Sequence, residues 1–263
     1  MPYAENQGAR IYWESHGEGK PVVLIMGLAF SLEMWHRTLP YLTPKYRAIV
    51  FDNRGVGRSG VPPGPYRISL MASDVLAVMD DAGVDAAHIV GASMGGMIAQ
   101  ELAIGSPARV RSLVLACSFC GVIRMKWPSF RLFRAARRWR HMTPRQRAEY
   151  FVPFLYSPST PRERIDEDLR IRVQHYPTDR GYFNQAAAMM LFSSHGRLRR
   201  IQCPTLIVHG ERDVIVPIEN ASILARRIPN ARLVSIPNAS HLFTTDQPDL
   251  SHETLLSFLA STS

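Results

Sequence analysis

Short apolar runs recur along the first 116 residues of the chain, separated by polar turns and by stretches with helical spacing. The runs cover residues 22–26, 47–51, 87–92 and 110–116, and residues 10–15 alternate between polar and apolar positions. Runs without a polar face are typical of strands buried on both sides of a parallel sheet, whereas alternation is typical of a half-buried strand. The pattern therefore predicts a sheet whose central strands are parallel.

Helical periodicity follows several of these runs. Residues 31–42 and 70–82 carry apolar side chains three and four positions apart, which places them on one face of a helix. Ser69 is expected to cap the second helix and Gly83 to end it. Strands and helices that alternate through short connections predict an α/β fold with a doubly wound, mostly parallel sheet.

The alternation stops near residue 120 and resumes near residue 200. Residues 121–199 contain helical stretches but no run typical of a central strand. Further strands and helices are then expected at residues 203–210, 218–228, 232–236 and 248–260. We therefore expect residues 1–120 and 200–263 to form one core, and residues 121–199 to be a helical lid inserted between two of its strands.

Positive charge is concentrated in the predicted lid. The chain has a formal net charge of +9, but residues 120–200 hold 17 Lys and Arg against 6 Asp and Glu, while the remainder holds 14 against 16. In residues 131–140 the arginines lie opposite the apolar side chains, which favours a helix packed on the body over one on a membrane surface. Solvated arginines explain this charge more simply than a nucleic-acid interface does, so no nucleic-acid partner is predicted.

The composition, with 46% hydrophobic and 20% charged residues, is ordinary for a soluble globular protein. No apolar run approaches the ~20 residues that span a bilayer, so no stable membrane insertion is predicted. Residues 1–6 lack the basic-then-apolar pattern of a secretory signal, and a cytoplasmic location is expected. A homodimer stays open as an alternative to a monomer.

Three cysteines raise the question of a metal or redox site. Cys117 and Cys120 have the C-x-x-C spacing, but two further zinc ligands at matching spacing are missing from the sequence. Cys117 closes an apolar run instead of opening a helix, which argues against a thioredoxin-like pair. We interpret both as small core or pocket residues, and we predict no catalytic metal because the histidines show no metalloprotease spacing.

The residues from Gly91 to Gly95 read Gly-Ala-Ser-Met-Gly and join an apolar run to a helix. In this context Gly-x-Ser-x-Gly is typical of a tight strand-to-helix turn that holds a serine out from the backbone in a strained conformation. Glycines two positions before and after the serine remove side chains that would collide across the turn. Ser93 is therefore predicted to be a nucleophile facing the free N–H groups and positive dipole end of the helix.

An acid and a histidine follow the later strands. Asp213 and His241 lie in loops after two strands of the predicted sheet. Because the carboxyl ends of parallel strands meet at one edge of a sheet, Ser93, Asp213 and His241 are expected to converge there. Their predicted roles are nucleophile for Ser93, general base and then acid for His241, and orienting carboxylate for Asp213.

Other residues offer alternatives to this triad and to this kind of site. Asp52 is a rival acid at the end of a strand, but its loop precedes the nucleophile and is better interpreted as turn structure. His209 is more simply a buried, hydrogen-bonded histidine. Residues 55–60 match G-x-G-x-x-G after a strand, but residues 61–65 hold three prolines and cannot open the helix that a dinucleotide site requires. No nicotinamide or flavin cofactor is therefore predicted.

An oxyanion hole needs two backbone N–H groups. Met94 follows the nucleophile and Leu28 lies in the first loop after a central strand, so these two residues are predicted to supply the donors. Residues close in sequence to the predicted catalytic loops are the candidates for the substrate pocket; they are Ala29, Trp35, Phe119 and Leu242.

The motifs together resemble the α/β-hydrolase fold superfamily. They are most similar to its branch of 3-oxoadipate enol-lactonases, small carboxylesterases, cofactor-free haloperoxidase-like esterases and aclacinomycin-type methylesterases. The matching pieces are residues 26–28, 52–59, 91–96 and 210–213, with Pro217 and residues 240–241. One departure is Met26, where many relatives carry histidine, and the lid segment matches nothing that identifies a substrate.

The resemblance and the predicted triad imply a serine hydrolase that cleaves a small-molecule carboxylic ester or lactone through an acyl-enzyme. A carbon–carbon bond hydrolase or a perhydrolase with the same triad is the first alternative. A non-catalytic ligand-binding module is the second, because a fold alone does not fix a function. Arginines of the lid are a hypothetical source of attraction for anionic substrates.

Overall fold

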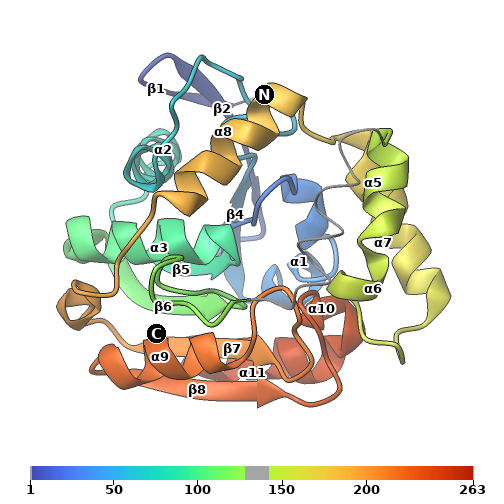
Figure 1. Ribbon diagram of the computed structural model, residues 1–263. Helices are drawn as coiled ribbons and strands as arrows, with labels where there is room; N and C mark the ends of the chain where they lie inside the picture. The colour runs from blue at the N-terminus through green and yellow to red at the C-terminus, as the bar shows by residue number, and fades with distance from the viewer. Residues whose placement is uncertain (1, 128–141, 263) are drawn as a thin grey trace.

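An eight-stranded sheet forms the centre of the computed structural model, which describes residues 2–127 and 142–262 (Figure 1). The strand order is β1-β2-β4-β3-β5-β6-β7-β8. The pairs β1/β2 and β2/β4 are antiparallel, and all pairs from β4 to β8 are parallel. The strands are β1 (Tyr3–Asn6), β2 (Ala9–His16), β3 (Lys20–Ile25), β4 (Tyr46–Phe51), β5 (Ala87–Ala92), β6 (Val110–Ala116), β7 (Thr205–Gly210) and β8 (Ala231–Ile236). The predicted fold class, α/β with a mostly parallel sheet, is confirmed.

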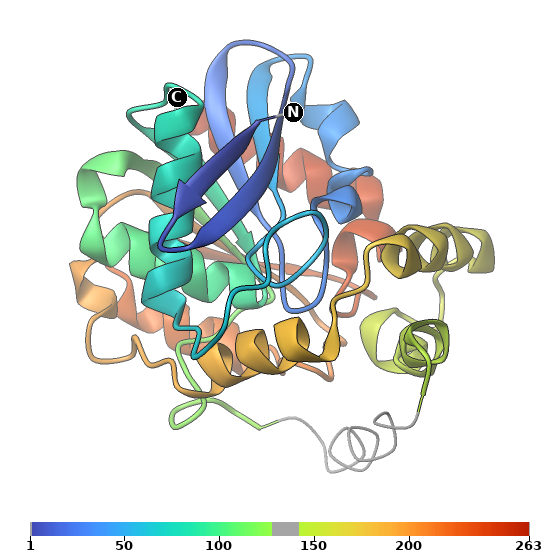
Figure 2. The same ribbon diagram turned by 90° about the horizontal axis from the view of Figure 1, so that it is seen from above.

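Helices cover both faces of this sheet (Figures 1 and 2). Buried residues of α2, α3 and α9 pack on one face, and those of α1, α10 and α11 pack on the other. These helices are α1 (Leu39–Leu42), α2 (Ile68–Asp81), α3 (Met94–Gly105), α9 (Glu219–Arg227), α10 (Phe243–Asp246) and α11 (Pro248–Ser261). Within the part of the chain that the structure describes, none of the helices is both long and apolar enough to cross a membrane.

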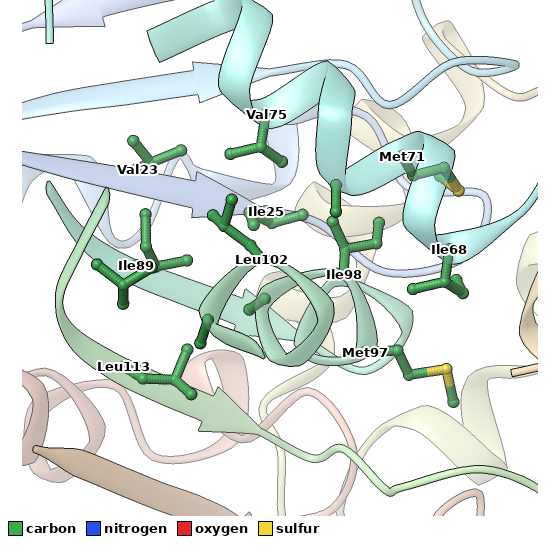
Figure 3. Close-up of a cluster of buried hydrophobic side chains, with 14 of the residues drawn as sticks. Val23, Ile25, Ile68, Met71, Val75, Ile89, Met97, Ile98, Leu102 and Leu113 are labelled. Atoms are coloured by element: carbon green, nitrogen blue, oxygen red, sulfur yellow. The ribbon is translucent and has the colours of Figure 1, made fainter. Parts of the chain in front are cut away.

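Both faces of strand β3 are covered by other side chains, which explains why its sequence has no polar face. Val23 and Ile25 point toward α2 and α3, where Leu102 lies in the same cluster (Figure 3). Val22 and Leu24, one position out of phase, belong to the cluster on the opposite face. These four side chains are fully buried, and burying each of them contributes about 1.5–3 kcal/mol to the stability of the fold.

The chain between β6 and β7 contributes helices of its own. They are α5 (Pro144–Tyr150), α6 (Val152–Leu155), α7 (Arg162–Gln174) and α8 (Asp179–Met190). Helices α5 to α7 lie together at one side of the sheet, and α8 runs back toward α2 and α3 (Figures 1 and 2). The two ends of this insertion meet where the Ser194 N–H donates to the Cys120 carbonyl at 2.9 Å. The helix predicted over residues 131–140 falls outside the described residues.

Helix α8 is held very close to the loop after β4. A Cβ atom at Gly181 would lie 2.1 Å from the carbonyl oxygen of Gly55, a distance that no side chain tolerates. Glycine at position 181 therefore allows the helix backbone to rest directly on that loop.

The prediction of a single helix over residues 31–42 is wrong. The segment forms a 3₁₀ turn, η1 (Leu32–Trp35), followed by the short helix α1. Pro40 is the physical reason, because a proline fits only the first turn of a helix, where its missing N–H leaves no bond unmade. A new helix must therefore start at Leu39.

The predicted cap at Ser69 is also wrong. Helix α2 begins at Ile68, and the extended Arg67 occupies the cap position without a side-chain cap hydrogen bond. Ile68 is almost completely buried, so its packing places the start of the helix two residues earlier than the cap pattern indicates. The other end is as predicted, with Gly83 in a left-handed conformation (φ 66°) directly after the helix.

A buried histidine in β5 makes stability depend on pH. His88 is inaccessible to solvent and its Nδ1 is bonded to the Ser112 hydroxyl at 2.8 Å. Burial, aided by Arg111 and Lys20, lowers the pKa of His88 to about 4. His88 therefore binds a proton near pH 6.5 in the unfolded chain, but only near pH 4 in the folded protein. Because the unfolded state binds more protons between these two values, the free energy of unfolding falls as the pH drops through this window.

We expect this histidine to account for about 2 kcal/mol of the stability lost between pH 7.5 and pH 5. Urea unfolding at the two pH values measures the loss, and His88→Asn, which can still bond to Ser112, should reduce it by that amount. Equal losses in the two proteins would contradict the prediction.

Candidate active site

Ser93 stands at the turn between β5 and α3 in a strained backbone conformation, with φ 55° and ψ −117°. Its N–H donates to the Ala116 carbonyl at 2.7 Å, and its carbonyl accepts from the Ser118 hydroxyl at 2.8 Å. A Cβ atom at Gly91 would lie 2.3 Å from the Gly95 carbonyl oxygen. The glycines therefore permit the sharp turn, and the neighbouring strand β6 fixes it.

His241 and Asp213 meet at the same edge of the sheet. The loops after β8 and β7 carry them, and His241 Nδ1 lies 2.7 Å from Asp213 Oδ2. The other carboxylate oxygen accepts from the N–H groups of Ile215 and Val216 at 2.9 and 2.8 Å. With the carboxylate fixed by its own loop, the imidazole is held with Nε2 free to act on a proton elsewhere.

The environment of Asp213 keeps it ionised. Burial alone would raise the pKa of this carboxyl, but the charge of His241 and hydrogen bonding from His209 and His241 outweigh burial and hold the pKa far below its usual range. His209 itself is fully buried, with Nε2 2.7 Å from the Val216 carbonyl and 3.4 Å from Asp213 Oδ2. It is thus a buried, hydrogen-bonded histidine, as expected, and it lies near the same carboxylate oxygen that His241 contacts.

One cluster near this pair has the spacing of a metal site. Ligand atoms of Cys117, His209 and Asp213 lie within 4.8 Å of one another. Burial raises the pKa of the Cys117 thiol well above its usual value, which disfavours the thiolate that a metal needs. The Asp213 oxygens are already engaged by His241 and two backbone N–H groups. This donor set is therefore better suited to supporting His241 than to holding a metal.

The loop after β3 lies directly against the nucleophile. A Cβ atom at Gly27 would be 3.1 Å from Ser93 Cβ, and Leu28 lines the same cavity as Ser93. Met94 is the first residue of α3 and is fully buried. The structure thus brings the loop that carries Leu28 next to Ser93, which Met94 follows directly in the chain.

Polar side chains from two other segments hold the loop after β3. Ala29 has a left-handed backbone (φ 66°), and its N–H donates to Gln185 Oε1 at 3.0 Å. Gln185, on α8, also donates from Nε2 to the Arg54 carbonyl at 2.8 Å. Asn53 Nδ2 donates to the Met26 carbonyl at 2.8 Å, so the loop after β4 holds the backbone of Met26, the residue that departs from the expected histidine.

Two cavities meet at the candidate nucleophile. A smaller one of about 60 Å³ and a larger one of about 280 Å³ are both lined by Ser93 and His241. The four predicted pocket residues line one or the other: Trp35 and Leu242 the smaller, Ala29 and Phe119 the larger. A carbonyl group placed at Ser93 would therefore have one substituent in each cavity.

The rival acid Asp52 lines neither cavity. Its Oδ1 accepts from the Leu32 N–H and its Oδ2 from the Arg58 N–H, each at 2.8 Å. These bonds tie the loop after β4 to η1, as the turn interpretation predicts. Cys117 and Cys120 are free and buried, as expected of core or pocket residues.

Two polar residues at the site were missed by sequence reasoning. Gln185 and Arg172 are both buried on helices of the insertion. Arg172 follows Ile165 and Leu169 at spacings of four and three, so it falls on the apolar stripe of α7. A charged residue within an apolar stripe is the pattern that could have found it, but the many surface arginines of this segment concealed it.

Comparison with known proteins identifies the family. Residues 20–248 match the family model described as the alpha/beta hydrolase fold. A protein of Azorhizobium caulinodans assigned as the carbamate hydrolase RutD is 34% identical over 98% of both chains. Among solved structures, the enol-lactonase of Burkholderia xenovorans LB400 is 26% identical with a TM-score of 0.86, covering 98% of this chain and all of that one. The esterase EaEST of Exiguobacterium antarcticum is 25% identical with a TM-score of 0.89, covering 98% of each chain.

The chain belongs to the α/β-hydrolase fold family, and the predicted resemblance is confirmed. It is a hydrolase of this family. The names of the similar proteins refer to different substrates, a carbamate in one case and an ester or lactone in the others. Membership of the family therefore does not identify the substrate.

Proposed function

We propose that the protein is a serine hydrolase that cleaves a carboxylic ester or lactone through an acyl-enzyme. The observation that carries the proposal is the 2.7 Å contact of His241 Nδ1 with Asp213 Oδ2 at the wall of cavities that Ser93 also lines. The strained turn at Ser93 supports it, because such turns serve to expose a nucleophile. An esterase and an enol-lactonase among the similar structures agree with this reaction.

The mechanism has two halves. Ser93 Oγ attacks the carbonyl carbon while His241 Nε2 takes the hydroxyl proton, and the N–H groups of Leu28 and Met94 stabilise the oxyanion. The tetrahedral intermediate expels the alkoxide, which leaves as an alcohol with the proton from His241. Water then attacks the acyl-enzyme with His241 again as base, and Ser93 is regenerated with release of the acid.

We further propose that residues 121–199 form a lid over this site. Tyr182 and Met189 of α8 and Arg172 of α7 line the larger cavity, so the insertion supplies much of the wall that a substrate would touch. Substrate choice is then a property of the insertion, whereas the reaction belongs to the sheet loops.

A substrate panel tests the proposed reaction. We expect release of p-nitrophenol from p-nitrophenyl acetate and butyrate, ring opening of a γ-lactone, and a Ser93-linked acyl adduct in rapidly quenched samples analysed by mass spectrometry. An aryl carbamate belongs in the panel, because its carbonyl can react at the same serine. A folded protein that turns over no ester or lactone, and forms no acyl adduct, would overturn the proposal in favour of carbamate or carbon–carbon bond hydrolysis.

A further inference from the structure

Arg172 is a buried cation in the wall of the larger cavity. Only 8% of the residue is exposed, and its Nε and Nη1 atoms are enclosed without a hydrogen-bond partner among the described residues. The guanidinium carbon lies 4.5 Å from the ring centroid of Phe30 and 5.9 Å from that of Tyr176. These aromatic rings stabilise the charge but offer no acceptor in the guanidinium plane to the N–H groups of Nε and Nη1.

No carboxylate of the described residues forms an ion pair with this guanidinium. Asp168, one turn earlier on α7, directs Oδ1 to Arg37 at 3.1 Å and Oδ2 to the Thr245 hydroxyl at 2.7 Å. No Asp or Glu is found among the described residues that line the larger cavity. The sequence of residues 128–141, outside the described part, contains no acidic residue either.

A buried, unpaired guanidinium is costly, and a charged partner that arrives with a ligand removes the cost. Burial lowers the pKa of Arg172, but from a starting value so high that the side chain stays protonated at neutral pH. The planar fork of an arginine matches a carboxylate with two parallel hydrogen bonds. The same cavity is lined by Ser93 and His241, so a single ligand in it faces both the guanidinium and the candidate nucleophile.

We propose that Arg172 binds a carboxylate group of the substrate, so that the ester or lactone hydrolysed at Ser93 is an anion. The inference rests on the proposed function and adds the substrate class to it. The carboxylate occupies the larger cavity, and the smaller cavity, whose wall is mainly apolar, takes the uncharged substituent of the carbonyl.

Two matched pairs of esters test the proposal on either side of the reacting bond. For the acyl side, 4-nitrophenyl hydrogen glutarate is compared with 4-nitrophenyl pentanoate. For the alcohol side, carboxyphenyl acetate is compared with phenyl acetate. In at least one pair, the wild type should favour the anion in kcat/KM by about 30- to 300-fold, which is the range for a buried, hydrogen-bonded charge pair.

Variants then assign that preference to one side chain. Arg172→Gln should lose the preference for the anion, because its kcat/KM for the anionic ester should fall far more than its kcat/KM for the neutral ester. Arg172→Lys should retain part of it, because a lysine keeps the charge but not the fork. Arg170→Gln is the matched control, since it removes the same charge from an exposed position of the same helix and should leave both esters unaffected.

A direct binding measurement tests the carboxylate site without relying on turnover or on the folding of Arg172→Gln. Glutarate should bind to Ser93→Ala, measured by calorimetry, and at least tenfold more weakly to Ser93→Ala/Arg172→Lys. Hydrolysis of neutral esters without any preference for either anion would overturn this proposal alone. Failure to hydrolyse any of the four esters, together with glutarate binding that depends on Arg172, would overturn the proposed reaction and leave the carboxylate site standing.

Discussion

Ser93→Ala is expected to lower kcat for p-nitrophenyl acetate by about 10⁵-fold, because the alanine removes the only atom proposed to bond to the acyl group. The remaining activity should come from the oxyanion hole and from binding. The fold should survive, since the Ser93 backbone bonds to Ala116 and Ser118 do not involve its hydroxyl. Initial rates by absorbance, with circular dichroism of both proteins, make the measurement.

Ser222→Ala provides the control for this prediction. Ser222 lies on α9 and lines neither cavity, so its loss should leave kcat within a factor of two. Equal activity in Ser93→Ala and the wild type would mean that the strained turn serves the fold and not the chemistry.

Asp213→Asn should lower kcat by about 10⁴-fold with little effect on KM. An asparagine oxygen can still accept from the N–H groups of Ile215 and Val216, so the loop is kept. The amide nitrogen then faces His241 Nδ1 and donates to it, which leaves the proton on Nε2, where the base must be free. Steady-state kinetics on an ester substrate measures the effect.

Asp52→Asn is the matched control, because Asp52 is an equally buried carboxylate that accepts from two backbone N–H groups. Its replacement should weaken the turn but keep kcat within tenfold. A large loss in Asp52→Asn together with near-normal activity in Asp213→Asn would reverse the assignment of the acid.

The sheet and the positions of the candidate triad follow from local sequence patterns. Fully apolar runs define central parallel strands, and residues that follow such strands must gather at one edge. That reasoning needs no knowledge of side-chain packing, and the structure does bring Asp213 and His241 into contact. The turn at Ser93 can be predicted from the pentapeptide Gly-Ala-Ser-Met-Gly alone, because its glycines meet the steric requirements of that turn.

The parts that sequence reasoning missed depend on packing between distant segments. Arg172 meets Phe30, and Gln185 meets Ala29, across more than 140 residues. No local pattern reveals which of the many arginines between β6 and β7 is buried. The start of α2 at Ile68 likewise follows tertiary packing over the cap preference of Ser69.

The two hydrogen bonds of Gln185 connect helix α8 to the loops after β3 and β4. One amide group on α8 holds both Ala29, next to the proposed oxyanion donor Leu28, and the Arg54 carbonyl. A displacement of α8 would break the bond from the Ala29 N–H and so release the left-handed backbone beside Leu28. We therefore expect the position of α8 and the geometry of the proposed oxyanion hole to change together, so that the two are coupled through a single amide group.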